Sequence, residues 1–402
     1  MSNKKHDLPR ISPWFYYLCL ALCFIITKLL FRLKNEKDPA IAEVKGGLLI
    51  VSNHQSYTDP LFIATAFPRR KIHFVAGRYL FEHNVLKRLF SWLGVIAKQQ
   101  LRPDAATIRD LIGLARKEAT LFLFPEGQRS VNGRTAMLQP ATGRLVKKLG
   151  LPVAVTRLSG SYLSWPRWGK RGIRLGKVSQ ETELLLTADE VGVLSAEAIN
   201  EKLKDALFVD EYARQLARKK PRRYRGKARA ERLDAILHWC PKCEQPFQLS
   251  AHDTTLACRA CDLSMTVERS GLLTDQSGAD TSLSRSPAVW HDTQVTSWHR
   301  YVLEHGFRFH AVLKTLDLSG DVKHMNRGVV TVTPTSYDFE MDNGEKFAVL
   351  YDGSINLFAD YGDFFQLMQE DGSLRIEPEN GQAVVACLDL ILSGYQSLRT
   401  TL

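Results

Sequence analysis

A histidine and an aspartate five residues apart form the most reactive pair of side chains in the N-terminal half. His54 and Asp59 lie in the segment Asn53–Pro60, directly after a short apolar run at 48–51. If this segment turns into a helix, the Asp59 carboxylate can accept a hydrogen bond from one imidazole nitrogen. The other nitrogen can then act as a general base on an alcohol. The alternative is structural, because aspartate followed by Pro60 is also typical of a helix N-terminus.

A second polar motif, Phe124–Ser130 (FPEGQRS), follows another apolar run at 121–124. Its carboxylate (Glu126) and guanidinium (Arg129) stand beside Gly127, which lets a ligand approach the backbone. Such a set suits a polar or phosphorylated substrate. The alternative is an ordinary turn with a surface ion pair. If the two apolar runs form parallel neighbouring strands, both motifs meet at one edge of the sheet.

The surrounding pattern predicts an α/β domain with a mainly parallel sheet flanked by helices. Short apolar runs alternate with helix-like stretches, which is typical of βαβ units. Active groups in such sheets gather at the carboxyl ends of strands, where both motifs lie. We predict strands at 48–51, 72–76, 121–124 and 153–158, and helices at 60–67, 80–93 and 105–117.

The two motifs together resemble the lysophosphatidic acid/glycerolphosphate acyltransferase family, the His-x4-Asp acyltransferases. In this chain, Asn-His-x4-Asp is followed about seventy residues later by Phe-Pro-Glu-Gly-x-Arg-Ser. Three further stretches, 74–81, 94–96 and 151–155, are similar to the family's other blocks. The resemblance covers roughly residues 45–210.

The resemblance implies an O-acyltransferase that uses acyl-CoA or acyl-carrier protein as donor. The acceptor would be the hydroxyl of a lysophospholipid such as 1-acylglycerol-3-phosphate, which places the reaction in phospholipid biosynthesis. His54 would be the general base and Asp59 its orienting partner. Glu126 and Arg129 would hold the acceptor, with Gly127 allowing close approach. The reaction needs no metal, and positioning two substrates at a membrane supplies much of the rate.

Two positions depart from the family pattern. Gln128 stands where the family usually has threonine. Gln100 stands where an arginine that contacts the acceptor phosphate is expected. Lys98 and Arg102 are the candidates to replace that arginine, although lysine is a point charge and cannot clamp a phosphate as a fork. The identity of the acceptor therefore stays open.

Four cysteines further along the chain have the spacing of a zinc ribbon. Cys240 and Cys243 form one CxxC pair, and after fourteen residues Cys258 and Cys261 form another. Four thiolates complete a tetrahedral zinc shell, and a closed shell of this kind is structural. The pattern also indicates a reducing compartment.

The N-terminal segment and the charge distribution favour a membrane surface as partner. The apolar run 14–27 has basic residues on both sides, and 14 residues fit either an interfacial helix or a buried core helix. Residues 301–402 carry 7 Lys/Arg against 15 Asp/Glu, whereas the whole chain has a net charge of +11, so the body is strongly basic. We expect a location at the cytoplasmic face of the cell membrane.

The composition suggests five segments: a membrane-associated helix (1–40), the acyltransferase domain (41–212), a basic linker (213–233), the zinc ribbon (234–272) and a β-rich C-terminal domain (288–402) that ends in a helix at 382–397. The rival hypothesis is a catalytically degenerate, membrane-tethered protein that binds nucleic acid or protein through the ribbon and the basic segment. Apart from Tyr224, the basic segment lacks interleaved aromatic residues, so nucleic acid is not expected as a partner.

Overall fold

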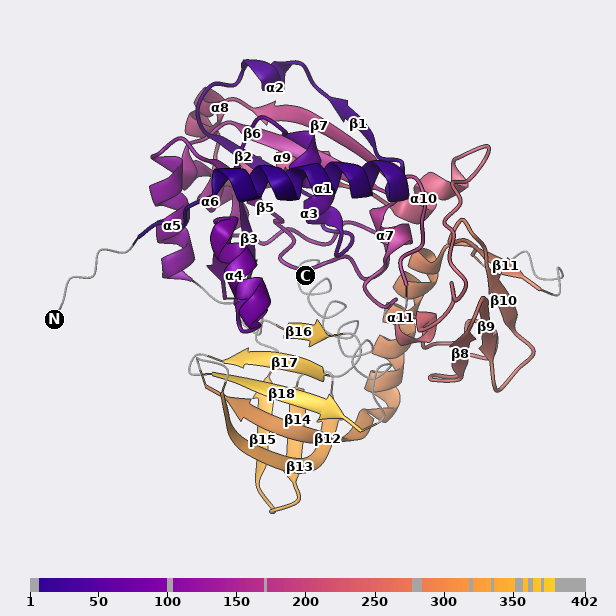
Figure 1. Ribbon diagram of the computed structural model, residues 1–402. Helices are drawn as coiled ribbons and strands as arrows, with labels where there is room; N and C mark the ends of the chain where they lie inside the picture. Colours follow the sequence, from indigo (N-terminus) through magenta and orange to yellow (C-terminus); the bar gives the residue numbers. More distant parts are fainter. Residues whose placement is uncertain are drawn as a thin grey trace. The chain divides into compact units, whose positions relative to one another are not determined.

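A computed structural model describes the chain over residues 7–99, 104–169, 172–276, 284–317, 321–333, 336–350, 357–360, 364–369 and 372–379. The chain divides into two compact units, and each is described by itself (Figure 1). The first comprises residues up to 167 together with 173–225, and the second comprises 168–172 together with residues from 226 onward.

The first unit is built on a seven-stranded sheet in the order β1-β7-β6-β2-β5-β3-β4. Strands β6, β2, β5, β3 and β4 run parallel, whereas β7 is antiparallel to β6 and pairs in parallel with β1. The strand bounds are β1 Lys34–Lys37, β2 Leu48–Ser52, β3 Ile72–Gly77, β4 Ile96–Lys98, β5 Thr120–Leu123, β6 Val153–Ser159 and β7 Ser179–Leu186. This architecture confirms the predicted α/β fold with a mainly parallel sheet.

All four predicted strands are present, and helices cover both faces of the sheet that contains them. In β2, Leu48 and Ile50 belong to the core on one face, and Leu49 and Val51 belong to the core on the other. A strand buried on both faces must be a continuous apolar run, which is the pattern that predicted it.

The helices of the first unit are α1 Pro13–Phe31, α2 Ala40–Glu43, α3 Asp59–Ala66, α4 Asn84–Trp92, α5 Ala105–Ala115, α6 Thr142–Leu149, α7 Ser161–Ser164, α8 Ala188–Val193, α9 Ala196–Leu207 and α10 Glu211–Leu216, with a 3₁₀ turn η1 at Arg78–Phe81. Side chains of α1, α2 and α3 fill one core, and those of α5, α6, α8 and α9 fill the other. The helix predicted at 80–93 is broken into η1 and α4, because the backbone at His83 is extended.

Strands β2 and β5 are parallel neighbours, with Leu48 opposite Thr120 and Val51 opposite Leu123. The two sequence motifs follow the carboxyl ends of these strands. They therefore meet at one edge of the sheet, as expected for parallel neighbouring strands.

The first part of the basic stretch packs on the first unit. Tyr224 is buried, and its hydroxyl donates a hydrogen bond to the Lys177 carbonyl at 3.1 Å. A Cβ on Gly176 would lie 2.2 Å from the Tyr224 ring, so only glycine allows this approach. The segment predicted as a linker at 213–233 thus spans the division between the two units at residue 225.

The second unit contains a small antiparallel sheet, a long helix and an antiparallel half-barrel, which confirms the remainder of the predicted fold class. The small sheet has the order β11-β10-β9-β8, and the half-barrel has the order β15-β14-β13-β12-β18-β17-β16. Their bounds are η2 Leu233–Ala235, β8 Leu249–His252, β9 Thr255–Cys258, β10 Ser264–Val267, β11 Leu273–Asp275, α11 Pro287–His305, β12 Phe307–Leu316, β13 Val322–Val332, β14 Ser336–Met341, β15 Lys346–Leu350, β16 Leu357–Asp360, β17 Phe364–Gln369 and β18 Gly372–Pro378. The helix predicted at 382–397 lies outside the described residues.

Candidate active site

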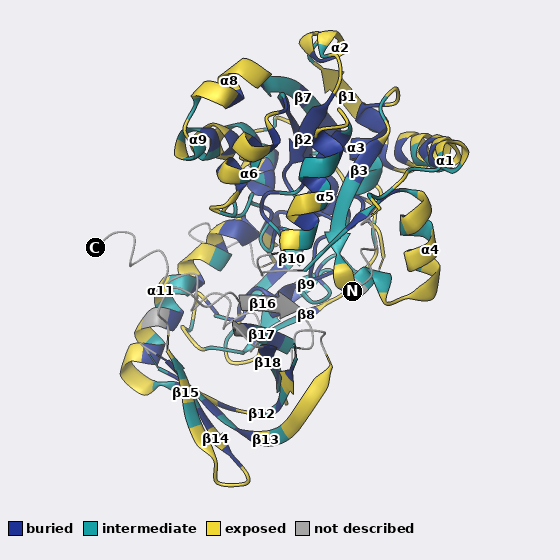
Figure 2. Cartoon of the chain, turned by 90° about the vertical axis from the view of Figure 1, so that its left-hand side faces the viewer, coloured by how far each residue is buried: buried dark blue, intermediate teal, exposed yellow. Residues whose placement is uncertain are grey.

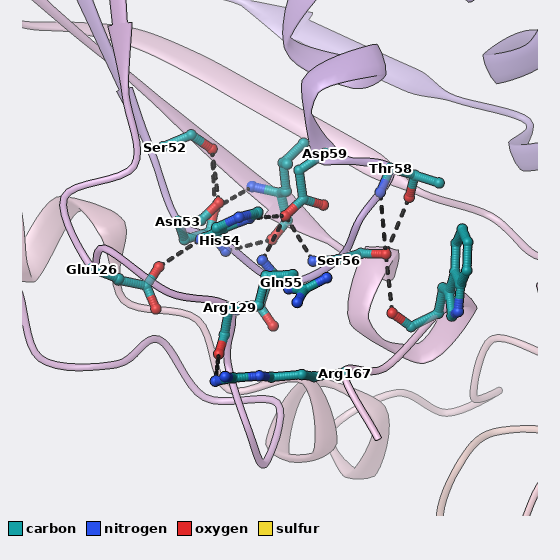
Figure 3. A network of polar contacts seen from close by, with 12 residues as sticks. Ser52, Asn53, His54, Gln55, Ser56, Thr58, Asp59, Glu126, Arg129 and Arg167 are labelled. Atoms are coloured by element: carbon teal, nitrogen blue, oxygen red, sulfur yellow. Dashed lines mark hydrogen bonds and ion pairs between the residues drawn. The ribbon is translucent and has the colours of Figure 1, made fainter. Parts of the chain in front are cut away.

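His54 and Asp59 form a hydrogen-bonded pair at the edge of the sheet (Figure 3). The imidazole Nδ1 lies 2.9 Å from the Asp59 Oδ2 atom. Because an ionised carboxylate only accepts hydrogen bonds, Nδ1 carries the proton and the lone pair is on Nε2. The pair therefore leaves Nε2 as the basic nitrogen.

The turn between the two residues is held by the same carboxylate. Asp59 Oδ2 also accepts hydrogen bonds from the backbone N–H groups of Gln55 (2.6 Å) and Ser56 (2.7 Å). Asp59 is the first residue of α3 and is fully buried. The N-cap residue is Thr58, whose side chain makes no capping hydrogen bond. Asp59 therefore has both roles: it stabilises the turn at the start of α3, and it also holds the imidazole.

The imidazole ring is held against an aromatic face. His54 stacks on Phe124, with ring centroids 3.7 Å apart and an interplanar angle of 9°. Burial lowers the pKa of His54 from its ordinary 6.5, and the positive charges of Arg129 and Arg167 act in the same direction, whereas Asp59 opposes the shift. The ring is therefore neutral at pH 7 and able to accept a proton.

The Glu126 side chain links its own loop to the backbone of the histidine motif. Its Oε1 accepts a hydrogen bond from the His54 N–H at 2.5 Å, and its Oε2 accepts one from the Ala136 N–H at 2.6 Å. Burial raises the pKa of Glu126 to about 8, against the effect of these two hydrogen bonds. Both oxygens are engaged within the protein, so this geometry favours a positioning role over contact with an acceptor.

A second connection joins the histidine motif to β6. The Asn53 side chain donates to the Leu158 carbonyl at 3.0 Å and accepts from the Leu158 N–H at 2.8 Å. The Ser56 hydroxyl donates to the Trp165 carbonyl at 3.0 Å. These contacts pin the loop on the side away from β5.

Arg129 and Gly127 occupy the loop that follows β5. The Arg129 guanidinium carbon lies 3.3 Å from the centre of the Tyr57 ring, in a cation–π contact at the exposed side of the site. Gly127 has φ of +74°, a conformation that favours glycine. The Ser130 N–H donates to the His54 carbonyl at 2.8 Å, which adds a second link between the motifs.

The two other predicted cations are not joined to this cluster. Lys98 ends β4 at the same sheet edge, and burial lowers its pKa. Among the described residues, no hydrogen bond or ion pair joins Lys98 to His54 or Glu126. Arg102 and Gln100 lie outside the described residues.

Three contributors had no assigned role in the sequence analysis: the Asn53 amide, the Arg167 guanidinium and the Gln55 amide. Gln55 is fully buried, and neither of its side-chain polar atoms has a partner within the described chain. A buried amide without a partner costs about 1–3 kcal/mol, so Gln55 is a candidate for contact with bound substrate. Asn53 stood next to the histidine in the motif, but nothing in one sequence indicates that Leu158 is its partner.

The four predicted zinc ligands are gathered in the second unit. Their sulfurs all lie within 4.8 Å of one another, and the pairs Cys240–Cys261 and Cys243–Cys258 are 3.7 Å apart. Tetrahedral zinc with bonds of about 2.3 Å separates its sulfurs by roughly 3.8 Å. The cluster therefore fits a tetrahedral metal ion.

Residues 32–158 match the family model described as Acyltransferase. Over 125 residues, the chain is 30% identical to a chloroplastic 1-acyl-sn-glycerol-3-phosphate acyltransferase of Brassica napus and 27% identical to one of Arabidopsis thaliana. Each alignment spans 31% of this chain and covers 36% and 34% of those relatives, about a third of their length. The similarity to the acyltransferase family therefore lies in residues 32–158.

Among solved structures, the 1-acyl-sn-glycerophosphate acyltransferase PlsC from Thermotoga maritima is similar, with a TM-score of 0.42 and 20% sequence identity. The similarity covers 52% of this chain and 82% of that one.

We predict that Glu126→Gln lowers both stability and activity. An amide nitrogen cannot accept a hydrogen bond, so one of the two backbone N–H groups is left buried without a partner, at a cost of about 1–3 kcal/mol. The control is Glu183→Gln, which alters a partly exposed carboxylate paired with Arg157. Chemical denaturation and acyl-transfer kinetics check this. A raised KM with unchanged stability would instead indicate that Glu126 binds the acceptor.

Proposed function

We propose that the chain is an O-acyltransferase that moves a fatty acyl group from a thioester donor to the hydroxyl of a lysophospholipid. The observation that carries this proposal is the hydrogen-bonded, buried pair of His54 and Asp59, which leaves a neutral imidazole with a basic Nε2. The donor would be acyl-CoA or acyl-carrier protein, as for the family that residues 32–158 resemble. The relatives' names make 1-acylglycerol-3-phosphate the first acceptor to test, in phospholipid biosynthesis.

In this reaction the acceptor hydroxyl transfers its proton to Nε2 of His54 as its oxygen attacks the thioester carbonyl carbon. The new carbon–oxygen bond forms, the carbon–sulfur bond breaks, and the leaving thiolate takes the proton back from the imidazolium. Asp59 stabilises that imidazolium through the bond to Nδ1. Asn53 and Glu126 act as positioning residues, because their hydrogen bonds fix the backbone on both sides of the histidine.

We further propose that α1 rests on a membrane surface. It is long and apolar enough to cross a bilayer by length and composition. Its buried side chains Tyr16, Leu20 and Phe31 form one stripe, and the Tyr16 hydroxyl donates to the Arg70 carbonyl at 3.1 Å. The outer face, yellow in Figure 2, exposes apolar side chains that include Leu18, Leu22 and Ile25. A helix attached sideways to its domain fits interfacial binding better than a free span, at the cytoplasmic face of the cell membrane.

We propose that the four-cysteine cluster binds one structural zinc ion. The four sulfurs have the spacing of a closed tetrahedral shell, so no coordination position is left for a substrate. The backbone has positive φ at Glu244, directly after Cys243, which makes a tight turn there. Trp239 and Phe247 pack on Trp298 of α11, with ring centroids 5.2 and 5.1 Å apart, so the metal would anchor an aromatic core.

The first test replaces the base. His54→Ala is expected to lower kcat/KM by a factor of about 10²–10⁴ with the fold retained, because the hydroxyl loses its proton acceptor. In the wild type, kcat/KM should fall as pH drops through a pKa below 6.5, since protonation removes the base. Product formation from an acyl donor and a lysolipid panel is measured by mass spectrometry. His305→Ala is the matched control, and wild-type turnover by purified His54→Ala protein would refute the mechanism.

The second test concerns the membrane. Replacing Leu18, Leu22 and Ile25 with serine removes apolar area that would leave water, so partitioning to anionic vesicles should fall by at least about 100-fold. Co-sedimentation with phosphatidylglycerol-containing vesicles measures this. Val193→Ser, at an exposed apolar site on α8, is the control. Unchanged binding of the triple variant would show that α1 is not the contact surface.

The third test concerns the metal. The purified chain should contain one zinc per molecule, and chelation should change tryptophan fluorescence and lower the stability of the second unit by several kcal/mol. Cys258→Ser should lose the metal, whereas Cys19→Ser should keep it. Elemental analysis of both variants decides the matter, and a wild-type chain that is folded and free of metal would contradict the proposal.

A further inference from the structure

A second guanidinium lies in the candidate active site, on a residue outside the segment that matches the acyltransferase family. Arg167 follows α7, and its side chain is buried, with 6% of the residue exposed. Its Nη1 donates to the Gln128 side-chain oxygen at 3.2 Å and to the Arg129 carbonyl at 3.4 Å. Figure 3 shows its guanidinium end reaching the main chain at Arg129.

The segment that carries Arg167 is tied to the histidine motif. The Ser56 hydroxyl donates to the Trp165 carbonyl at 3.0 Å, and the rings of Trp165 and Tyr57 are 5.0 Å apart. Tyr57 in turn lies under the Arg129 guanidinium. Arg129 and Arg167 are thus held by one set of contacts beside His54, and the charges of both act on the imidazole.

The carboxyl groups closest to His54 make their hydrogen bonds within the protein. Asp59 Oδ2 accepts hydrogen bonds from the imidazole and from two backbone N–H groups, and both oxygens of Glu126 accept backbone N–H groups. Burial raises the pKa of Glu126 to about 8, which favours its neutral form at pH 7. Arg129 and Arg167 add two positive charges that act on the imidazole, so the site has a positive potential. Arginine is the side chain best suited to bind the oxygens of a phosphate.

We propose that Arg167 is a specificity-determining residue that binds the acceptor phosphate beside Arg129, with Gln128 holding Arg167 in place. The inference rests on the proposed acyl transfer and adds a residue, outside the segment that matches the family, that selects a phosphorylated acceptor over its neutral counterpart. It also connects two departures from the family pattern. Glutamine replaces threonine at 128 and contacts Arg167, while glutamine at 100 replaces the arginine expected to contact that phosphate.

The experiment compares two acceptors that differ only in the phosphate: 1-acylglycerol-3-phosphate and the matching monoacylglycerol. Arg167→Met should lower kcat/KM for the phosphorylated acceptor by about 10–100-fold more than for the neutral acceptor, the equivalent of one lost charge-assisted hydrogen-bonding group. Gln128→Thr should shift the same preference by a smaller factor. Arg157→Met, which removes a guanidinium paired with Glu183 on the sheet, is the control.

Each other outcome has a distinct meaning. An equal loss for both acceptors would show that Arg167 only supports the loop, and it would overturn the inference. A raised KM for acyl-CoA but not for acyl-pantetheine would assign the site to the phosphates of the donor instead.

Binding is measured in parallel by calorimetry with an unreactive 2-deoxy analogue of the phosphorylated acceptor. Wild-type protein that transfers no acyl group to any lysolipid would refute the proposed function. In that case, weaker binding of the analogue by Arg167→Met than by wild type would still support the phosphate site, and equal binding would refute it.

Discussion

The whole arrangement depends on the parallel pairing of β2 with β5 and on the carboxyl group that spans their ends. The pairing brings two loops, seventy residues apart in sequence, to one sheet edge. Glu126 then binds the backbone N–H of His54, and the Ser130 N–H binds the His54 carbonyl. With Asn53 bonded to Leu158 of β6, the histidine backbone is fixed from both neighbouring strands. A general base must be held in place before it can help a reaction, and here the sheet itself supplies that constraint.

Burial is the largest influence on the pKa of the His54 imidazole. Burial and the charges of two guanidinium groups lower the pKa of the imidazole, and the hydrogen bond to Asp59 acts in the opposite direction. The same guanidinium groups would attract an anionic acceptor, so one charge pattern serves both catalysis and recognition. The outer face of α1 would bring this site to lipid substrates, since the helix packs on α3, which begins with Asp59.

The sequence was informative where one physical rule decides the outcome. Continuous apolar runs predicted β2 and β5 because both faces of these strands are buried, and the cysteine spacing predicted the cluster because tetrahedral zinc geometry permits few arrangements. It was uninformative where a partner is distant along the chain. For Glu126, a carboxylate in a loop does not reveal that its two oxygens will accept hydrogen bonds from two backbone N–H groups, and its predicted contact with the acceptor stays a prediction. Arg167 was overlooked because only the fold brings residue 167 to Gln128. The roles of His54, Asp59 and Arg129 remain predictions that kinetics must test.

The central claim is that the site holds a neutral imidazole, protonated on Nδ1, with its Nε2 lone pair available to a substrate hydroxyl. Nitrogen-15 NMR of histidine-labelled protein, with His54 assigned by difference from a His54→Gln variant, measures this state directly. We predict the neutral Nδ1–H tautomer at pH 7 and a titration midpoint below 6.5. An imidazolium at pH 7, or a neutral ring with the proton on Nε2, would contradict it.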